Sequence, residues 1–293
     1  MSNNLALAAE ADTAALLHDY SVEITARHPN AAAICRTSLA PGSKVYLAFL
    51  PGDTHDTVVH TATALRGAGF EPVPHVLGRH VTSARQLDGF LARLAGDAGV
   101  TQALLVAGDI DRPEGPYESG LEVLRSGLLQ KHGFRRIGLA VYPEPHPKIP
   151  PDLLDQALLD KLEVAAEAGL EPWLVTQFCF EAAPIVERLR RLRAQGVTAP
   201  LRIGLAGPAS RRTLWNYALH CGIGTSIRAL GARMDVVSNL MARRSPDALV
   251  ADLAAARRRE PVLGIEGVHI FTFGGVPGAA AWANGVLAAS GKL

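Results

Sequence analysis

Eight short apolar segments alternate with helical patterns along the 293 residues, and this alternation restricts the fold more than any other feature. Successive parallel strands need a crossover between them, usually a helix, so the pattern predicts an α/β fold with a parallel sheet. The count of eight favours a closed (β/α)8 TIM barrel over an open doubly wound sheet. The predicted strands are 20–26, 44–50, 70–76, 101–107, 134–141, 170–177, 201–206 and 267–273.

Helical patterns fill the gaps between these strands. Apolar residues three and four apart predict helices at 56–69, 83–99 and 151–169, each ending in the Gly that suits a helix C-cap. The last connection carries two such patterns, 211–224 and 246–260, and residues 1–18 predict an extra N-terminal helix. A chain of this length could also form two modest domains. No linker or charge block divides it, so we expect a single (β/α)8 domain over 1–293.

Charge and hydropathy exclude several classes of protein. The 29 basic and 28 acidic residues are spread along the chain, which argues against a nucleic-acid surface and favours a small-molecule ligand. No apolar run reaches the roughly 18 residues of a membrane span. Cys35, Cys179 and Cys221 are scattered and form no CxxC motif, so neither a disulfide framework nor a zinc site is expected, and a reducing cytoplasm fits best.

The N-terminal segment has an apolar side but contains Glu10 and Asp12 and lacks a basic leader region. It is therefore predicted to be a surface helix and not a signal peptide. Its apolar stretch 5–17 would suit the interface of a homo-oligomer, and a lid or a barrel plug are equally open interpretations.

Polar residues gather where the predicted strands end, which is the active-site end of a TIM barrel. Glu23 lies in the first strand, His75 in the third, Asp109 after the fourth and Gln177 at the end of the sixth. The fifth strand leads into "YPEPHP" at 142–147, whose prolines fix the backbone and reduce the entropy lost on ligand binding. A carboxylate in a strand covered on both faces needs a reason, so we interpret Glu23 as functional.

Other motifs have simpler interpretations. "GDTHDT" at 52–57 resembles a metal cluster, but Asp53 or Thr54 suits a helix N-cap, and we expect no metal. His75 could be a satisfied core histidine, and "AGD" at 107–109 a simple turn. The Gly-rich 204–210 and 221–226 could cradle an anion but fit strand-to-helix turns better. "RLRRLR" at 188–193 is predicted to be a solvated helix face.

The ordered set of motifs resembles the methylenetetrahydrofolate reductase family. The segments are "SVEIT" in strand one, "PHV" in strand three, "AGD" closing strand four, "VYPEPHP" after strand five, "EAGLEPWLVTQFCFE" through strand six and "GVHIFTF" in strand eight. They cover nearly the whole chain in the family's order, and the fifth and sixth are the most specific.

The resemblance implies an NAD(P)H-dependent oxidoreductase of one-carbon metabolism and methionine biosynthesis. Such an enzyme interconverts 5,10-methylenetetrahydrofolate and 5-methyltetrahydrofolate, passing hydride through FAD as a flavoprotein. By the same resemblance Glu23 is the general acid that opens the five-membered ring, because the bridging methylene accepts hydride poorly until a neighbouring nitrogen is protonated. Asp109 would lie between folate and flavin, and Gln177 and Phe178 would contact the folate. The implied flavin contacts are His75, Gly108, Tyr117, Ala140, Tyr142, His146 and Lys161.

The chain also departs from the family pattern. Ala107 stands where the family has Arg, and apolar Leu158, Val164 and Ala165 replace the groups that face the flavin diphosphate, leaving Lys161 as the basic residue there. Each lost charge-assisted hydrogen bond weakens binding by roughly 1.5–3 kcal/mol. Direct hydride transfer between nicotinamide and folate is therefore an alternative to FAD. A second alternative is an inactive folate-binding or assembly subunit of a demethylation system. The direction of the reaction stays open.

Overall fold

The computed structural model describes residues 2–221 and 243–290. Its eight main strands are all parallel where their register is recorded and close into a barrel in the order β1-β10-β7-β6-β5-β4-β3-β2. The predicted (β/α)8 barrel is therefore confirmed. The strands are β1 (Ser21–Thr25), β2 (Lys44–Ala48), β3 (Glu71–Leu77), β4 (Gln102–Val106), β5 (Arg136–Val141), β6 (Glu171–Thr176), β7 (Leu201–Ala206) and β10 (Ile265–Phe271).

Helices follow the strands as the sequence patterns predict, and the N-terminal helix is present. They are α1 (Ser2–Leu17), α2 (Ala31–Ser38), α3 (His55–Gly67), α4 (Ala84–Ala98), α5 (Gly120–Arg125), α6 (Leu128–Lys131), α7 (Pro151–Glu167), α8 (Ala182–Ala194), α9 (Arg211–His220), α11 (Asp247–Arg259) and α12 (Val276–Ala289). Short 3-10 turns occur at η1 (Gly78–His80) and η3 (Pro261–Leu263), and β8 (Ala209–Ser210) pairs with β9 (Arg243–Arg244). Among the described helices, none is long and apolar enough to cross a membrane.

Side-chain caps fix where several helices begin. The hydroxyl of Thr54 accepts from the backbone N–H of Thr57, which confirms the N-cap interpretation of "GDTHDT". Ser83 caps α4 in the same way, and Ser119 forms a capping box with Glu122 at the start of α5. Ser210 caps α9, so the segment 204–210 is a strand-to-helix turn. The Gly-rich 221–226 lies outside the described residues except for Cys221.

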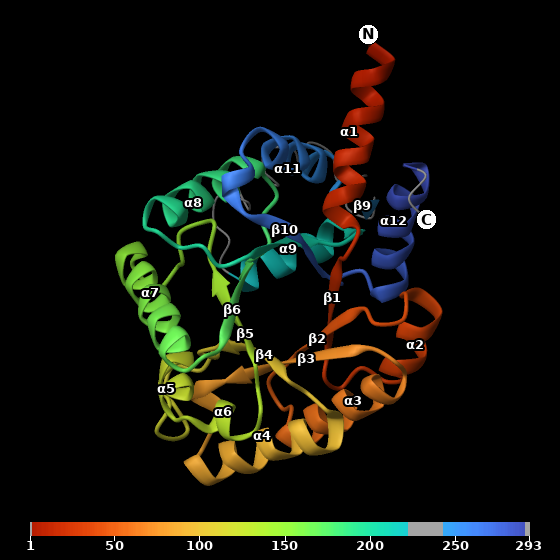
Figure 1. The fold of residues 1–293 in the computed structure, drawn as a ribbon. Coiled ribbons are helices and arrows are strands. Elements are labelled where there is room, and N and C mark those ends of the chain that lie inside the picture. The colour runs from red at the N-terminus through yellow and green to blue at the C-terminus, as the bar shows by residue number, and fades with distance from the viewer. Residues whose placement is uncertain (1, 222–242, 291–293) are drawn as a thin grey trace. The chain divides into compact units, whose positions relative to one another are not determined.

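The chain packs as two compact parts. One comprises Glu23–Ala140 and Asp152–Leu174. In it β2, β3, β4 and β5 pair in parallel register, and α3 and α4 pack side by side along them (Figure 1). Its interior combines aliphatic and aromatic side chains, with Val45, Leu47 and Val73 fully buried and Tyr46 1% exposed.

The other part comprises Met1–Val22, Val141–Pro151 and Val175–Leu293. Here β7 pairs with β10, and α1 packs against α11, α12 and β10 (Figure 1). Ala14, Leu16 and Leu17 of α1 are fully buried. The C-terminal end of α1 therefore belongs to the core of its own part.

Two expectations need correction. Strand β10 begins at Ile265, two residues before the predicted 267, because Gly264 turns the chain at φ 64° and Ile265 already pairs with Leu201. The segment 188–193 is not simply a solvated face. Arg188 is buried, and Arg193 donates to the carbonyls of Val197, Ala199 and Leu263. The Arg193 guanidinium is partly buried because it donates to carbonyl groups of residues that follow α8 in the chain. The charge pattern of α8 alone cannot indicate these acceptors.

Candidate functional site

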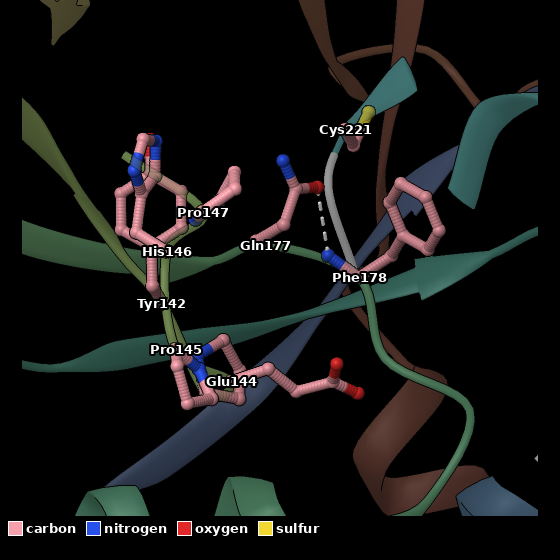
Figure 2. Close-up of a pocket in the computed structure, with 9 residues that line it drawn as sticks. Tyr142, Glu144, Pro145, His146, Pro147, Gln177, Phe178 and Cys221 are labelled. Atoms are coloured by element: carbon pink, nitrogen blue, oxygen red, sulfur yellow. Dashed lines mark hydrogen bonds between the residues drawn. The ribbon is translucent and has the colours of Figure 1, made fainter. Parts of the chain in front are cut away.

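A pocket lies where β5 and β6 end, at the carboxyl ends of these strands (Figure 2). The space between its lining residues is about 240 Å³, a volume that includes open solvent. Its lining is Tyr142, Pro143, Glu144, Pro145, His146, Pro147, Gln177, Phe178 and Cys221.

Hydrogen bonds hold the two halves of the pocket together. The backbone N–H of Gln177 donates to the carbonyl of Val141 at 2.8 Å, which joins the ends of β6 and β5. The thiol of Cys179 donates to Glu144 Oε1 at 3.2 Å, and Glu144 is buried. The Gln177 side-chain oxygen accepts from the N–H of Phe178 at 2.9 Å. That bond orients the amide and assigns its NH₂ group as the donor for a ligand.

The two titratable rings of the pocket, Tyr142 and His146, are neutral near pH 7. Burial raises the pKa of Tyr142, and nearby Cys221 raises it further, so the phenol keeps its proton. Burial lowers the pKa of His146, and Lys148 adds to that effect. The backbone N–H of Lys148 donates to His146 Nδ1, which places the ring proton of the neutral tautomer on Nε2. The His146 ring lies edge-on to Tyr142, with centroids 5.0 Å apart.

Aromatic side chains support the floor of this pocket. Phe178 is buried and contacts Phe180, Phe271 and Phe273 with ring centroids 4.9–5.8 Å apart. Tyr217 of α9 stacks on Phe273 at 3.9 Å. Such packing fixes Phe178 and with it the neighbouring Gln177 amide.

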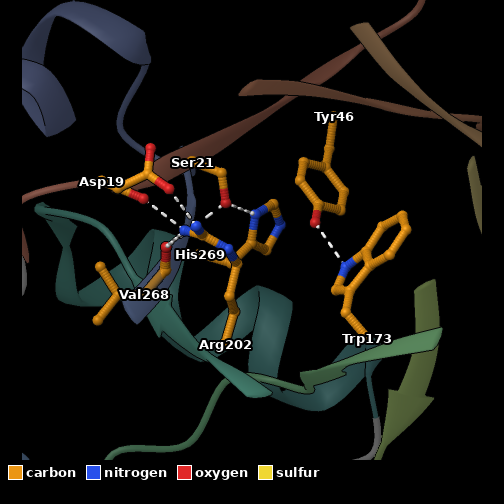
Figure 3. Close-up of polar contacts among 7 residues, drawn as sticks. All are labelled: Asp19, Ser21, Tyr46, Trp173, Arg202, Val268 and His269. Carbon is orange, nitrogen blue, oxygen red and sulfur yellow. Dashed lines mark hydrogen bonds and ion pairs between the residues drawn. The ribbon is translucent and has the colours of Figure 1, made fainter. Parts of the chain in front are cut away.

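A partly buried acid and base lie together in the other part of the chain. His75 Nε2 on β3 lies 3.3 Å from Glu23 Oε2 on β1, and their side chains are 13% and 17% exposed. The two atoms are in close polar contact, without the geometry of a good hydrogen bond. Tyr46 of β2 lies edge-on to His75, with centroids 6.4 Å apart. The indole N–H of Trp173 donates to Tyr46 Oη at 2.9 Å (Figure 3).

Gly138 of β5 makes room for this arrangement. A Cβ placed there would lie 2.7 Å from the Trp173 ring and 2.7 Å from Leu104 Cδ1. Any side chain at this position would displace the indole that holds Tyr46.

Asp109 follows β4 and lies beside a different histidine. Its Oδ1 is 3.3 Å from His80 Nε2, and Glu114 approaches His80 Nδ1 at 3.9 Å. Gly108 has φ 103° and would place a Cβ 3.0 Å from the His80 ring, so the "AGD" turn is shaped around His80. The Asp109 side chain is 58% exposed and available to a ligand.

The predicted site residues thus fall into three groups. Tyr142, His146, Gln177 and Phe178 line one pocket. Glu23 contacts His75, and Asp109 contacts His80. That Glu23, Asp109 and Gln177 surround one ligand stays a prediction, as do the cofactor roles of Gly108, Ala140 and Tyr117. Tyr117 is buried, which raises its pKa, and Ala140 is half-buried in β5.

Several residues of these groups were not singled out from the sequence. Tyr46 and Trp173 lie in strands whose apolar pattern predicts only core, and their partnership links positions 127 residues apart. His80 lies in the 3-10 turn η1 and Glu114 in a loop, and neither belongs to a sequence motif. The sequence feature that could have indicated the Tyr46–Trp173 pair is a Tyr or Trp inside a buried strand, since its polar atom needs a hydrogen-bond partner.

The charged residues of α7 determine whether this helix could bind the diphosphate of FAD, as the family resemblance implies. Burial lowers the pKa of Lys161, while Glu122 and Asp160 partly oppose this. Lys161 is the single basic residue of α7, and Leu158 and Ala165 are buried on the same helix. The acidic residues of α7 are Asp152, Asp155, Asp160, Glu163 and Glu167. A diphosphate beside this helix would meet more negative than positive charge.

No family model matches the chain. Among solved structures, it is similar to dihydropteroate synthase from Thermus thermophilus, with a TM-score of 0.48 and 17% identity. The match covers 92% of this chain and 93% of that one. Among the described residues, no group of three or more His, Cys, Asp or Glu side chains is placed to hold a metal ion.

Proposed function

We propose that the chain is a methylenetetrahydrofolate reductase-like oxidoreductase. The observation that carries this proposal is the pocket at the ends of β5 and β6. It joins "YPEPHP" at 142–147 with Gln177 and Phe178, the two segments of sequence that most resemble the family. They lie about 30 residues apart in the chain, and the pocket offers polar groups from both segments to one ligand.

The proposed chemistry assigns one task to each group. Glu23 donates its proton to a folate nitrogen, which opens the five-membered ring and leaves an electrophilic iminium at the methylene carbon. A hydride from reduced nicotinamide adds to that carbon and gives the methyl group. The Gln177 amide and the Phe178 ring hold the pterin, and Asp109 faces the reacting carbon and stabilises its positive charge.

The donor set around α7 does not fit the diphosphate of FAD. Lys161 is the one basic residue of α7, and the negative charges of Glu122 and Asp160 already interact with it. The same helix carries five carboxylates. We therefore derive no step through a flavin. Hydride passes directly from the nicotinamide C4 to the methylene carbon, and the nicotinamide leaves as NAD(P)⁺.

The test uses the purified full chain with 5,10-methylenetetrahydrofolate and NADH or NADPH. We expect loss of the reduced-nicotinamide absorbance, matched by 5-methyltetrahydrofolate, from a protein without flavin absorbance. Glu23→Gln should lower kcat by about 10²- to 10⁴-fold, the usual contribution of a general acid. Glu266→Gln, at an exposed glutamate of β10, is the matched control and should leave kcat unchanged.

Three results would contradict this. Wild-type protein that binds folate without turnover would favour the binding-subunit alternative, as would a Glu23→Gln variant with unchanged turnover. A yellow preparation whose flavin is reduced by NADH would restore the FAD route.

A further inference from the structure

His75 and Glu23 form an acid–base pair that two strands hold in place. Glu23 comes from β1 and His75 from β3, and Nε2 and Oε2 are 3.3 Å apart. Neither side chain is more than 17% exposed. A small rotation of either side chain would align the two atoms for a hydrogen bond.

The packing around His75 restricts its ring. Tyr46 lies edge-on against it, and the phenol is itself held by the Trp173 indole at 2.9 Å. Gly138 leaves the space that the indole occupies. Residues of β2, β5 and β6 therefore restrict the side of the His75 ring that faces Tyr46.

The proposed reaction requires that Glu23 be reprotonated after each turnover, and His75 is the neighbouring group that can do this. Reduction of the methylene group consumes one proton per turnover, and Glu23 supplies it. Glu23 is then a carboxylate with little contact with solvent, and a new proton must reach it before the next turnover. Burial disfavours an unpaired charge, so the carboxylate left after each turnover is costly until a proton reaches it.

We propose that His75 returns the proton to Glu23, an inference that rests on the proposed function. After Glu23 has protonated the folate, His75 takes a proton from solvent, and the resulting imidazolium gives its Nε2 proton to Glu23 Oε2. One solvent proton therefore enters for each proton that the folate gains. When 5-methyltetrahydrofolate is oxidised, the same protons move in the opposite direction. His75 acts through Glu23 and is a positioning residue.

The relay predicts a particular kinetic signature. His75→Gln keeps a polar side chain but cannot exchange protons. In a single turnover with enzyme in excess, Glu23 starts protonated, so this variant should reduce folate at close to the wild-type rate. In steady state its kcat should fall by about 10²-fold, at the low end of what a positioned acid–base group contributes. Glu23→Gln, by contrast, should lose both rates.

Rescue and controls complete the experiment. His75→Ala leaves space for added imidazole, which should restore part of its steady-state rate while leaving the single-turnover rate unchanged. His60→Gln, at an exposed histidine of α3, should match wild type in both assays. Circular dichroism and thermal unfolding of each variant report whether the fold is kept.

Each outcome decides between the alternatives. Unchanged steady-state turnover in His75→Gln would overturn the relay and leave the proposed reductase intact. Equal loss of both rates, with a raised KM, would make His75 a ligand contact and would also overturn it. A folded wild-type protein without turnover of methylenetetrahydrofolate would overturn the reductase and the relay together.

Discussion

The thiol of Cys179 donates a hydrogen bond at 3.2 Å to Oε1 of Glu144, a residue that lines the pocket at the ends of β5 and β6. Both residues are buried, with Cys179 fully enclosed and Glu144 8% exposed. This contact and the backbone bond from Gln177 to Val141 connect the proline-rich loop to the exit of β6.

Cys179→Ala removes one donor from a buried carboxylate. The expected cost is about 1–3 kcal/mol of unfolding free energy, measured by urea denaturation, because the oxygen loses a partner that water cannot easily replace. Cys179→Ser keeps a donor of similar reach and should lose clearly less. Equal losses for the two variants would show that packing of the sulfur, and not its hydrogen bond, is what matters.

Much of the fold could be predicted from the sequence, because local pattern determines it. All eight strands were located, as was the Thr54 cap, since alternation and capping depend on neighbours within a few residues. The segments 142–147 and 177–178 follow strands that are neighbours in the barrel, and parallel strands that are neighbours end side by side.

The remaining features depend on partners far away in the chain. The sequence predicts a solvated Arg193, whereas in the structure its guanidinium donates to the carbonyl of Leu263, 70 residues later in the chain. The Tyr46 and Trp173 pair likewise needs the barrel to bring β2 and β6 around a shared interior. Such contacts depend on side-chain length and rotamer, and neither produces a periodic pattern in the sequence.

Gly138→Ala should destabilise the protein and disturb the interior of the barrel. The new methyl group would overlap the Trp173 ring at 2.7 Å, and overpacking of this kind costs about 1–3 kcal/mol. We expect a lower urea midpoint and a shifted Trp fluorescence spectrum. Gly89→Ala in α4, where no atom lies within 4 Å of the new Cβ, should be neutral or stabilising by up to about 1 kcal/mol. Similar losses at both glycines would contradict this account.

Arg202 should matter more for stability than the carboxylate it contacts. Its guanidinium donates to the side chain and the carbonyl of Asp19 and approaches the carbonyl of Val268, beside the buried Ser21 and His269 pair (Figure 3). The Asp19 side chain is 59% exposed, so Asp19→Asn should cost no more than about 1 kcal/mol. Arg202→Ala also removes the bonds to both carbonyls and should cost about twice as much or more. Urea denaturation measures both, and an Asp19→Asn loss as large as that of Arg202→Ala would be inconsistent with this ranking.

Cys35 should make stability depend on pH in the alkaline range. Burial raises the pKa of this thiol from 9.0 to about 11, so the folded state holds the proton more tightly than the unfolded chain does. Its contribution is therefore full below pH 9 and is lost as the pH rises toward 11, a change of about 2–3 kcal/mol. Burial also raises the pKa of Tyr20 to about 12, so Tyr20 lowers the unfolding free energy from about pH 10 upward. The contribution of Cys35 must therefore be measured separately. The measurement is the unfolding free energy of wild type and Cys35→Ala at several values between pH 7 and pH 11. The difference between the two proteins should be constant up to pH 9 and then shrink, whereas a constant difference throughout would mean that the buried thiol titrates as it does in the unfolded chain.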